Sequence, residues 1–148
     1  MSQDEVIRRY AQRVGYSDQE AANLAPGDPR ARHIVRLSQA APRYAIQAEV
    51  TEARHCNTGY RPGDRFLLDV DGNFITKLCP KRLCVYLVSQ MALPVALINE
   101  RLSEGLDPNL FHFTRQIHCP DVGLECGGYG KVSLKMSVVP RVQEARPA

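Results

Sequence analysis

The sequence predicts an α+β fold in which an antiparallel sheet packs on a buried central helix that a proline interrupts. Apolar residues recur at helical spacing before residue 42, the period changes to two at Tyr44, and a long apolar stretch precedes further strand patterns. We therefore expect three parts. These are a helical N-terminal extension over residues 1–42, an α+β core domain over 43–141 and a flexible tail over 142–148.

The first two helices of the extension have clear local signals. Apolar side chains at a spacing of four give the first helix one stripe, which consists of Val6, Tyr10 and Val14. Ser17 and Glu20 have the spacing of a capping box, in which each side chain bonds the backbone N–H of the other residue. A short second helix is therefore expected to begin after Ser17.

A third helix is expected after a break in the chain. Pro26-Gly27 should end the second helix, and Asp28-Pro29 supplies a cap and a preset first turn for the third. The candidates for burial on this helix are Ile34, Val35 and Leu37. We interpret the whole extension as a packing or oligomerisation element.

Strand and turn patterns begin the core domain. Apolar and polar residues alternate over 44–51, as is typical of a half-buried strand. A turn signal over 61–64 precedes a second predicted strand over 65–69. Asp71-Gly72-Asn73 predicts another turn before a short strand over 74–76.

The central helix is predicted from about Pro80 to residue 103. Its composition is apolar nearly all round, which favours a buried helix. Pro94 lacks a backbone N–H, so it should kink or divide the helix. Gly105 followed by Leu106 is typical of a helix that ends in the left-handed conformation.

Two further strands are predicted over 110–119 and 131–139, and a glycine-rich loop joins them. Alternation along the first of these puts four residues on its apolar side, namely Phe111, Phe113, Ile117 and Cys119. The second strand would complete the sheet.

Composition limits the classes of function. The chain has 148 residues and a mass of 16.6 kDa, and 44% of its residues are hydrophobic and 24% charged. A domain of this length buries roughly 68–70% of its unfolded surface, so it needs no disulfide or metal to stay folded. The 19 basic and 16 acidic residues give a net charge of +3, which does not indicate a nucleic-acid binder. No Gly-x-Gly-x-x-Gly or Gly-Lys-Ser/Thr motif occurs, so no nucleotide cofactor is expected.

The sequence also predicts a cytoplasmic protein with no membrane partner. The first residues are polar and acidic, unlike a signal peptide. The longest apolar stretch, over 83–98, is interrupted by polar residues and is shorter than the ~20 residues that span a bilayer. Five cysteines without a secretion signal indicate a reducing compartment, in which thiols are free or bound to metal.

The cysteines form the candidate site. If register holds along the strands, Cys56 and Cys119 lie on apolar faces at strand ends. Cys79 would cap the central helix, whose dipole favours a thiolate, and Cys126 lies in the glycine-rich loop. We expect these four residues to converge as metal ligands where the central helix begins, with Cys84 as a fifth, more buried member.

Thiolates at such a site would select zinc or iron. The spacing alone is not diagnostic, because the chain contains no pair of cysteines separated by two residues. Five buried, inert thiols are the alternative interpretation, because free cysteine is among the most buried residue types. A catalytic thiol is a further alternative.

Four residues are candidates for catalysis. Cys79 would be the nucleophile, and Asp121, Glu125 or His118 would act as acid or base beside it. Asp121 has a simpler interpretation, because the sequence Pro-Asp-Val-Gly over 120–123 is typical of a turn. In such a turn the aspartate side chain bonds the nearby backbone.

Several short motifs occur over about residues 44–141. They consist of Cys56, Gly63, Phe66, Cys84 and a Cys-x-Asp-x-Gly turn before the last strand, formed by Cys119, Asp121 and Gly123. In these positions the chain resembles a family of small uncharacterised bacterial cysteine-containing domains. Residues 1–42 have no counterpart in the family pattern, and the loop that carries Cys126 differs from the usual ending. The resemblance implies a single cysteine-bearing domain and no particular substrate.

These observations favour a small domain with a cysteine-lined metal or redox site that acts as a subunit or partner of a larger enzyme system. A protein partner or a homo-oligomer is expected, and a small-molecule ligand is possible. The first alternative is a free-standing lyase, isomerase or hydrolase that uses a cysteine thiolate or a metal-bound water. The second is a structural adaptor without chemistry.

Overall fold

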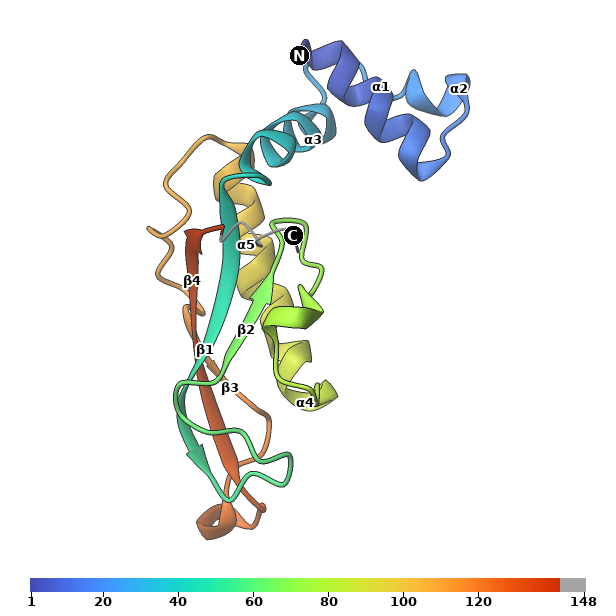
Figure 1. Cartoon of the computed structure of the whole chain (residues 1–148). Helices are drawn as coiled ribbons and strands as arrows, with labels where there is room; N and C mark the ends of the chain where they lie inside the picture. Colours follow the sequence, from blue (N-terminus) through green and yellow to red (C-terminus); the bar gives the residue numbers. More distant parts are fainter. Residues whose placement is uncertain (142–148) are drawn as a thin grey trace, which may run out of the picture.

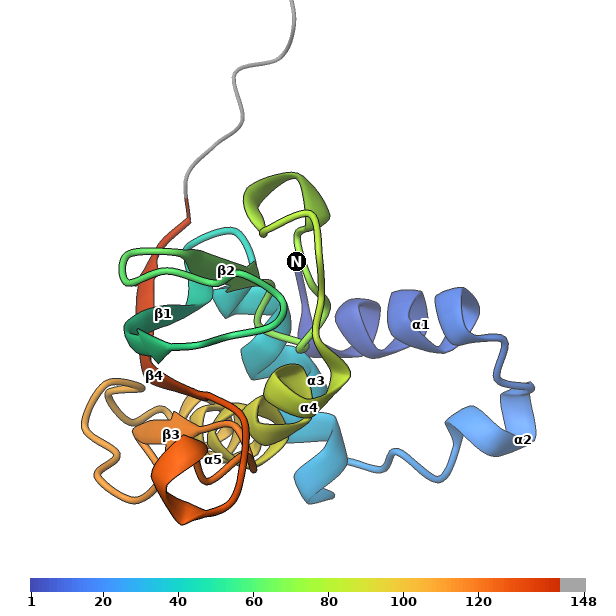
Figure 2. The ribbon, with the colours of Figure 1, turned by 90° about the horizontal axis from the view of Figure 1, so that it is seen from below.

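The computed structural model describes residues 1–141, and the predicted tail over 142–148 lies outside them. The chain forms a four-stranded antiparallel sheet in the order β2-β1-β4-β3, with helices against one face (Figures 1 and 2). The strands are β1 (Tyr44–Arg54), β2 (Arg65–Leu68), β3 (Gln116–His118) and β4 (Lys131–Pro140). The predicted α+β class is therefore confirmed.

Three helices precede the sheet, as predicted. They are α1 (Gln3–Val14), α2 (Asp18–Ala21) and α3 (Pro29–Ala40). Both hydrogen bonds of the predicted capping box are present between Ser17 and Glu20. Asp28 caps α3, and Pro29 occupies its first turn. These helix starts follow from local sequence because each uses side chains within a few residues of the backbone groups that they satisfy.

Burial differs sharply between these helices. In α3, Val35 and Leu37 are buried in the core, whereas Ile34 is half-buried. In α1, only Ala11 is buried, and Val14 at the end of the predicted apolar stripe is exposed. The helix α3 therefore belongs to the core, while α1 and α2 extend from it (Figure 1).

The long strands β1 and β4 pair over their whole length. Register runs from Tyr44 opposite Pro140 to Arg54 opposite Lys131, with a shift between Val50 and Glu52. A bulge of this kind changes the face of the sheet on which the following side chains lie. The alternation of inward and outward side chains therefore does not extend to Cys56, which follows β1.

The core lies between one face of the sheet and the helices that follow β2. Apolar side chains from strands and helices form one cluster, which includes Ile46, Phe66, Leu134 and Met136 from the sheet and Leu87, Met91 and Ile98 from the helices. On the other face of β1 and β4, polar side chains such as Gln47 and Lys135 are not buried. The alternation expected for a half-buried sheet is therefore present.

The predicted central helix is wrong at its start. The region forms η1 (Thr76–Leu78), α4 (Val85–Val88), η2 (Ser89–Met91) and α5 (Ala92–Ser103), where η denotes a 3₁₀ helix. Residues 80–84 are not helical, and Cys84, not Cys79, precedes the first helical turn. Pro94 lies in the first turn of α5. Backbone N–H groups in the first turn make no hydrogen bond within the helix, so a proline there breaks none. The short η2 segment, and not this proline, separates α4 from α5.

The central helices are also less buried than predicted. Three large apolar side chains are at least half exposed, namely Val85, Tyr86 and Leu93. The end of α5 is as expected, because Gly105 is left-handed and the amide of Leu106 bonds the carbonyl of Arg101. Within residues 1–141, no helix combines the length and apolar character needed to cross a bilayer.

Two predicted strands are shorter in the structure. The strand over 74–76 is reduced to one bridge between Phe74 and Leu68. The strand over 110–119 is reduced to β3 because Thr114 is left-handed, with φ 56°, and Phe113 is exposed. Beyond β3, the side-chain amide of Asn109 takes the place of a strand, since it donates to the carbonyl of Val138 and accepts from its N–H, both at 2.8 Å.

Candidate functional site

Three of the five thiols line one cavity of about 910 Å³, a volume within the roughly 300–1,000 Å³ typical of small-molecule sites. The thiols belong to Cys56, Cys84 and Cys119, which come from three separate stretches of chain. Apolar and aromatic side chains form much of the remaining wall, namely Tyr60, Tyr86, Leu87, Val122, Tyr129 and Val132. We call this space the thiol cavity.

Cys56 enters the thiol cavity through a turn after β1. His55 adopts a left-handed conformation, with φ 51°, and the amide of Gly59 bonds the carbonyl of Cys56 at 3.0 Å. The side chain of Cys56 is half-buried and packs against the core. The predicted inward orientation of Cys56 is therefore present, although a turn and not strand alternation produces it.

Cys84 is held at the cavity by Tyr60. The backbone N–H of Cys84 donates to the Tyr60 hydroxyl at 2.8 Å, and that hydroxyl donates to the carbonyl of Arg82 at 2.7 Å. Burial raises the pKa of Tyr60. The hydrogen bond from the backbone N–H of Cys84 lowers this pKa, and the electrostatic effects of the Cys84 and Cys56 thiols raise it further. Tyr60 therefore lines the thiol cavity with Cys56 and Cys84, and its hydroxyl is bonded to the backbone on both sides of Leu83.

Cys119 lies directly after β3. Its backbone N–H donates to the carbonyl of Val132 at 2.9 Å, and its Sγ accepts from the N–H of Val132 at 3.4 Å. The thiol thereby satisfies a backbone donor at the start of β4. Cys119 is half-buried, as expected for a residue at the edge of the core.

Asp121 also lines the thiol cavity, but its carboxylate is occupied by backbone donors. It accepts from the amides of Tyr129 at 2.9 Å and of Gly123 and Gly130, both at 3.0 Å. The hydrogen bond from Tyr129 has the largest effect in lowering the pKa of Asp121, and those from Gly123 and Gly130 act in the same direction. Asp121 thus shapes the loop between β3 and β4, in line with its interpretation as a turn residue.

Cys79 lies away from this cavity. Its Sγ accepts from the N–H of Leu67 at 3.4 Å and donates to the carbonyl of the same residue at 3.3 Å, so it acts as a partner for β2. Burial raises the pKa of Cys79, and a backbone hydrogen bond from Leu67 partly offsets the shift. The prediction of a helix cap that favours the thiolate is therefore wrong.

The remaining predicted residues lie outside the thiol cavity. Cys126 is exposed in η3 (Leu124–Cys126) and, with Glu125, lines a neighbouring hollow of about 450 Å³. His118 is exposed, and its Nδ1 lies 2.7 Å from the carbonyl of Cys119. The structure therefore does not gather the predicted acid–base residues around Cys79.

The four predicted metal ligands are divided in the same way. Cys56 and Cys119 share the thiol cavity with Cys84, whereas Cys79 and Cys126 lie elsewhere. In the part of the chain that the structure describes, no three His, Cys, Asp or Glu side chains are placed to hold one metal ion. Sequence analysis also missed Tyr60, because its contact with Cys84 joins residues that are 24 positions apart.

Comparison of the chain with known protein families, curated proteins and solved structures finds no match. The resemblance to small bacterial cysteine-containing domains therefore stays a prediction. Functional inference rests on the thiol cavity itself.

Proposed function

We propose that the protein is a small thiol redox domain that works as a subunit or partner of a larger enzyme system. The observation that supports this proposal is the common cavity of Cys56, Cys84 and Cys119. A thiolate attacks a disulfide to form a mixed disulfide, and a second protein thiol nearby can then displace the bound small thiol, so the reaction needs two thiols beside a space for the substrate. Cys56 and Cys84 are the proposed pair because both line this cavity together with Tyr60, whose hydroxyl holds the backbone of Cys84.

The proposed reaction oxidises this pair with a small disulfide. The thiolate of Cys56 or Cys84 attacks one sulfur of the small disulfide, which forms a mixed disulfide and releases one small thiolate that takes up a proton. The second protein thiol loses its proton and displaces the other small thiol. The products are a disulfide between Cys56 and Cys84 and two molecules of reduced small thiol, so that electrons and protons balance.

The surroundings of the cavity support a partner. Large apolar side chains at its wall are exposed, with exposed fractions of 69% for Tyr86, 60% for Val122 and 85% for Tyr129. Apolar side chains that gather on a surface in this way are typical of interaction sites. A partner enzyme at this surface would receive or supply the electrons of the thiol pair.

Oxidised glutathione tests the reaction. The reduced protein is incubated with it, free thiols are blocked by alkylation, and peptides are mapped by mass spectrometry. We expect the wild type to contain a disulfide between Cys56 and Cys84, and Cys56→Ser and Cys84→Ser to stop at a mixed disulfide with one glutathione. Cys119→Ser and Cys126→Ser are matched controls that should still form the disulfide.

Two results would contradict the proposal. One is modification of Cys126 alone, because that thiol is exposed without belonging to the thiol cavity. The other is an equal content of mixed disulfide in all four variants. Zinc or iron retained in stoichiometric amount by wild type and lost in Cys56→Ser, Cys84→Ser and Cys119→Ser would instead support a metal function at the same cavity.

A further inference from the structure

β3 ends before the far end of β4, although the loop between α5 and β3 lies beside that end (Figures 1 and 2). The two strands keep one register, and their last ladder bond joins the N–H of Met136 to the carbonyl of Arg115 at 2.8 Å. Hydrogen-bonded residue pairs recur at every second position of an antiparallel ladder. The next such pair along these strands would therefore be Phe113 and Val138.

Asn109 occupies the place of Phe113 in this ladder. Its side-chain amide donates to the carbonyl of Val138 and accepts from the N–H of the same residue, both at 2.8 Å. These are the two backbone groups that Phe113 would bond in a continued ladder. Within residues 1–141, neither the N–H nor the carbonyl of Phe113 has a hydrogen-bond partner. Asn109 and Phe113 are thus alternative partners for the same two groups of Val138.

The chain is strained where it leaves the ladder. Thr114, which separates Phe113 from the last bonded residue, has φ 56°, a left-handed conformation that is rare for a β-branched side chain. The Thr114 hydroxyl and the neighbouring Nε of Arg115 are buried and have no hydrogen-bond partner in the described part of the chain. Such atoms are uncommon in folded proteins, because burial removes their bonds to water. An extended Thr114 would be free of the backbone strain.

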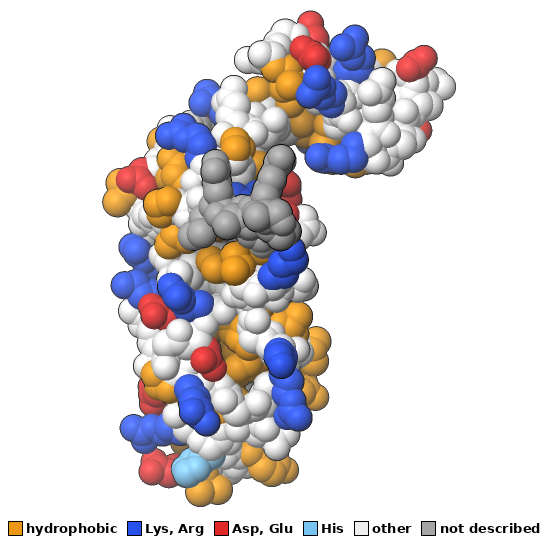
Figure 3. All heavy atoms as spheres, in the orientation of Figure 1, with side chains coloured by type: hydrophobic (Ala, Val, Ile, Leu, Met, Phe, Trp, Pro, Cys, Tyr) orange, Lys and Arg blue, Asp and Glu red, His pale blue; other side chains and the backbone are white. Residues whose placement is uncertain are grey.

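Side-chain burial also favours a longer strand. Alternation places Phe113 on the same side of β3 as Ile117, which packs against the core, and opposite Val138, which is only 7% exposed. In the observed turn Phe113 is instead 64% exposed, and Leu110 of the same loop is 68% exposed. Figure 3 shows hydrophobic side chains at the surface on the side where this loop lies in Figure 1. Extension of β3 would move an aromatic side chain from water to the apolar face of the sheet.

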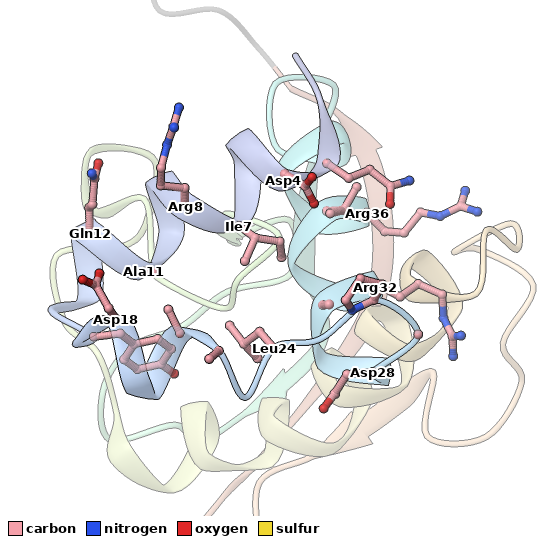
Figure 4. A pocket seen from close by; sticks show the side chains of 18 residues that line it. Asp4, Ile7, Arg8, Ala11, Gln12, Asp18, Leu24, Asp28, Arg32 and Arg36 are labelled. Carbon is pink, nitrogen blue, oxygen red and sulfur yellow. The ribbon is translucent and has the colours of Figure 1, made fainter.

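The hollow between α1 and α3 has no comparable strain. Ile7 and Leu24 point into it (Figure 4), but the left-handed residues in this part of the chain are glycines, which adopt a positive φ without a steric penalty. Among the described residues other than glycine, only His55 and Thr114 have a positive φ. His55 belongs to the turn that carries Cys56, so the edge of the sheet is the place where strain, exposure and competing hydrogen bonds coincide.

We propose that this edge is a two-state switch in which Asn109 and Phe113 exchange places at Val138. In the second state β3 extends to Phe113, whose backbone bonds both groups of Val138, and the Asn109 side chain is released. Thr114 then has strand geometry. Both states satisfy Val138, as expected for two packings of similar free energy. The exchange controls how much aromatic surface the edge presents, and it does not depend on the proposed thiol reaction.

Backbone NMR of three variants tests the switch. Asn109→Ala removes the competing amide, and Thr114→Val keeps a β-branched side chain that disfavours the left-handed turn. Both should favour the extended state, so hydrogen exchange of the Phe113 amide should slow by at least about tenfold relative to wild type. The chemical shifts of residue 114 should change to extended values. Thr114→Gly favours the observed turn and should leave the Phe113 amide as fast as in wild type, or faster.

His112→Ala is the matched control, because His112 is exposed in the same loop and would lie on the polar face of an extended β3. Circular dichroism must show that each variant is folded. If Asn109→Ala is not, Thr114→Val decides the test, because it keeps the Asn109 amide. Fast exchange of the Phe113 amide in the folded variants overturns the proposal. Slow exchange that appears only at high protein concentration, with a doubled mass in sedimentation, also overturns it, because a strand of a second molecule would then occupy the edge.

Discussion

The Tyr60 hydroxyl bonds two backbone groups of the segment that precedes α4. It accepts the N–H of Cys84 at 2.8 Å and donates to the carbonyl of Arg82 at 2.7 Å. These two bonds hold the non-helical segment before α4 against the thiol cavity. Tyr60 itself is buried and stacks edge-on against Phe66 of β2. The position of one thiol is therefore coupled to the packing of the core.

Tyr60→Phe should lower the free energy of unfolding by about 1–3 kcal/mol, because the amide of Cys84 loses its buried acceptor. Tyr129→Phe, at a side chain that is 85% exposed, is the control and should change it by less than about 0.5 kcal/mol. Chemical denaturation measures both values. If Tyr60→Phe and wild type had the same free energy of unfolding, the two hydrogen bonds would make no net contribution to stability.

The same variant should alter the dependence of stability on alkaline pH. The folded protein raises the pKa of Tyr60, chiefly by burial, so the protonated hydroxyl stabilises the fold. This contribution is full below the ordinary pKa of 10.0 and decreases as the pH rises through the raised value. The difference in melting temperature between wild type and Tyr60→Phe should therefore narrow above pH 10.0.

Asp121→Asn should destabilise the loop between β3 and β4 in a pH-dependent manner. The folded protein lowers the pKa of Asp121, so its carboxylate stabilises the fold above the ordinary value of 3.8. That stability is lost as the pH falls through the lowered value. Melting temperatures across the acidic range should therefore converge for wild type and variant, whereas Glu125→Gln in the same loop should follow wild type throughout.

Gly130→Ala should disrupt the approach of β1 to the start of β4. A Cβ at Gly130 would overlap the carbonyl oxygens of His55 and Arg54, which are backbone atoms that cannot rotate away. We expect a loss of about 1–3 kcal/mol in the free energy of unfolding. Gly127→Ala is the comparison, because its Cβ meets nothing within 4 Å and only its left-handed φ is strained. A larger loss for Gly127→Ala would contradict this steric account.

Thr114→Gly should stabilise the protein by up to about 1 kcal/mol. Thr114 is a β-branched residue at φ 56°, where glycine has no steric penalty. Its hydroxyl is buried without a hydrogen-bond partner within residues 1–141, so the substitution removes no bond. Thr114→Ala keeps the strained backbone and should give a smaller gain by thermal denaturation. A glycine variant less stable than the alanine variant would show that the strain is not relieved.

Sequence analysis succeeded where structure depends on neighbours in the chain. Ser17 and Glu20 satisfy each other's amides across three residues, and Asp28 caps the helix that directly follows it. The alternation over the first half of β1 was visible because Ile46, Ala48 and Val50 enter the core. In each case the residues that fix the conformation lie within the predicted element.

Distant contacts explain the errors. Pro80 has the local signal of a helix start, but the contact of Tyr60 with Arg82 and Cys84 keeps the chain irregular up to α4. Cys79 then pairs with Leu67 of β2 instead of capping a helix. The grouping of Cys56, Cys84 and Cys119 depends on contacts between three segments that are far apart in the chain. The sequence therefore predicted a site made of cysteines, but it included Cys79 and Cys126 in place of Cys84.

The pairing of Asn109 with Val138 has a consequence for how molecules meet at high concentration. Beyond β3, the outer side of β4 would present an unpaired N–H and C=O, and such groups can recruit a strand from another molecule. The amide of Asn109 occupies both groups of Val138, so neither group is free to pair with another strand. One side chain thus closes the outer side of β4 at this position, while β2 and β3 form the two edges of the sheet.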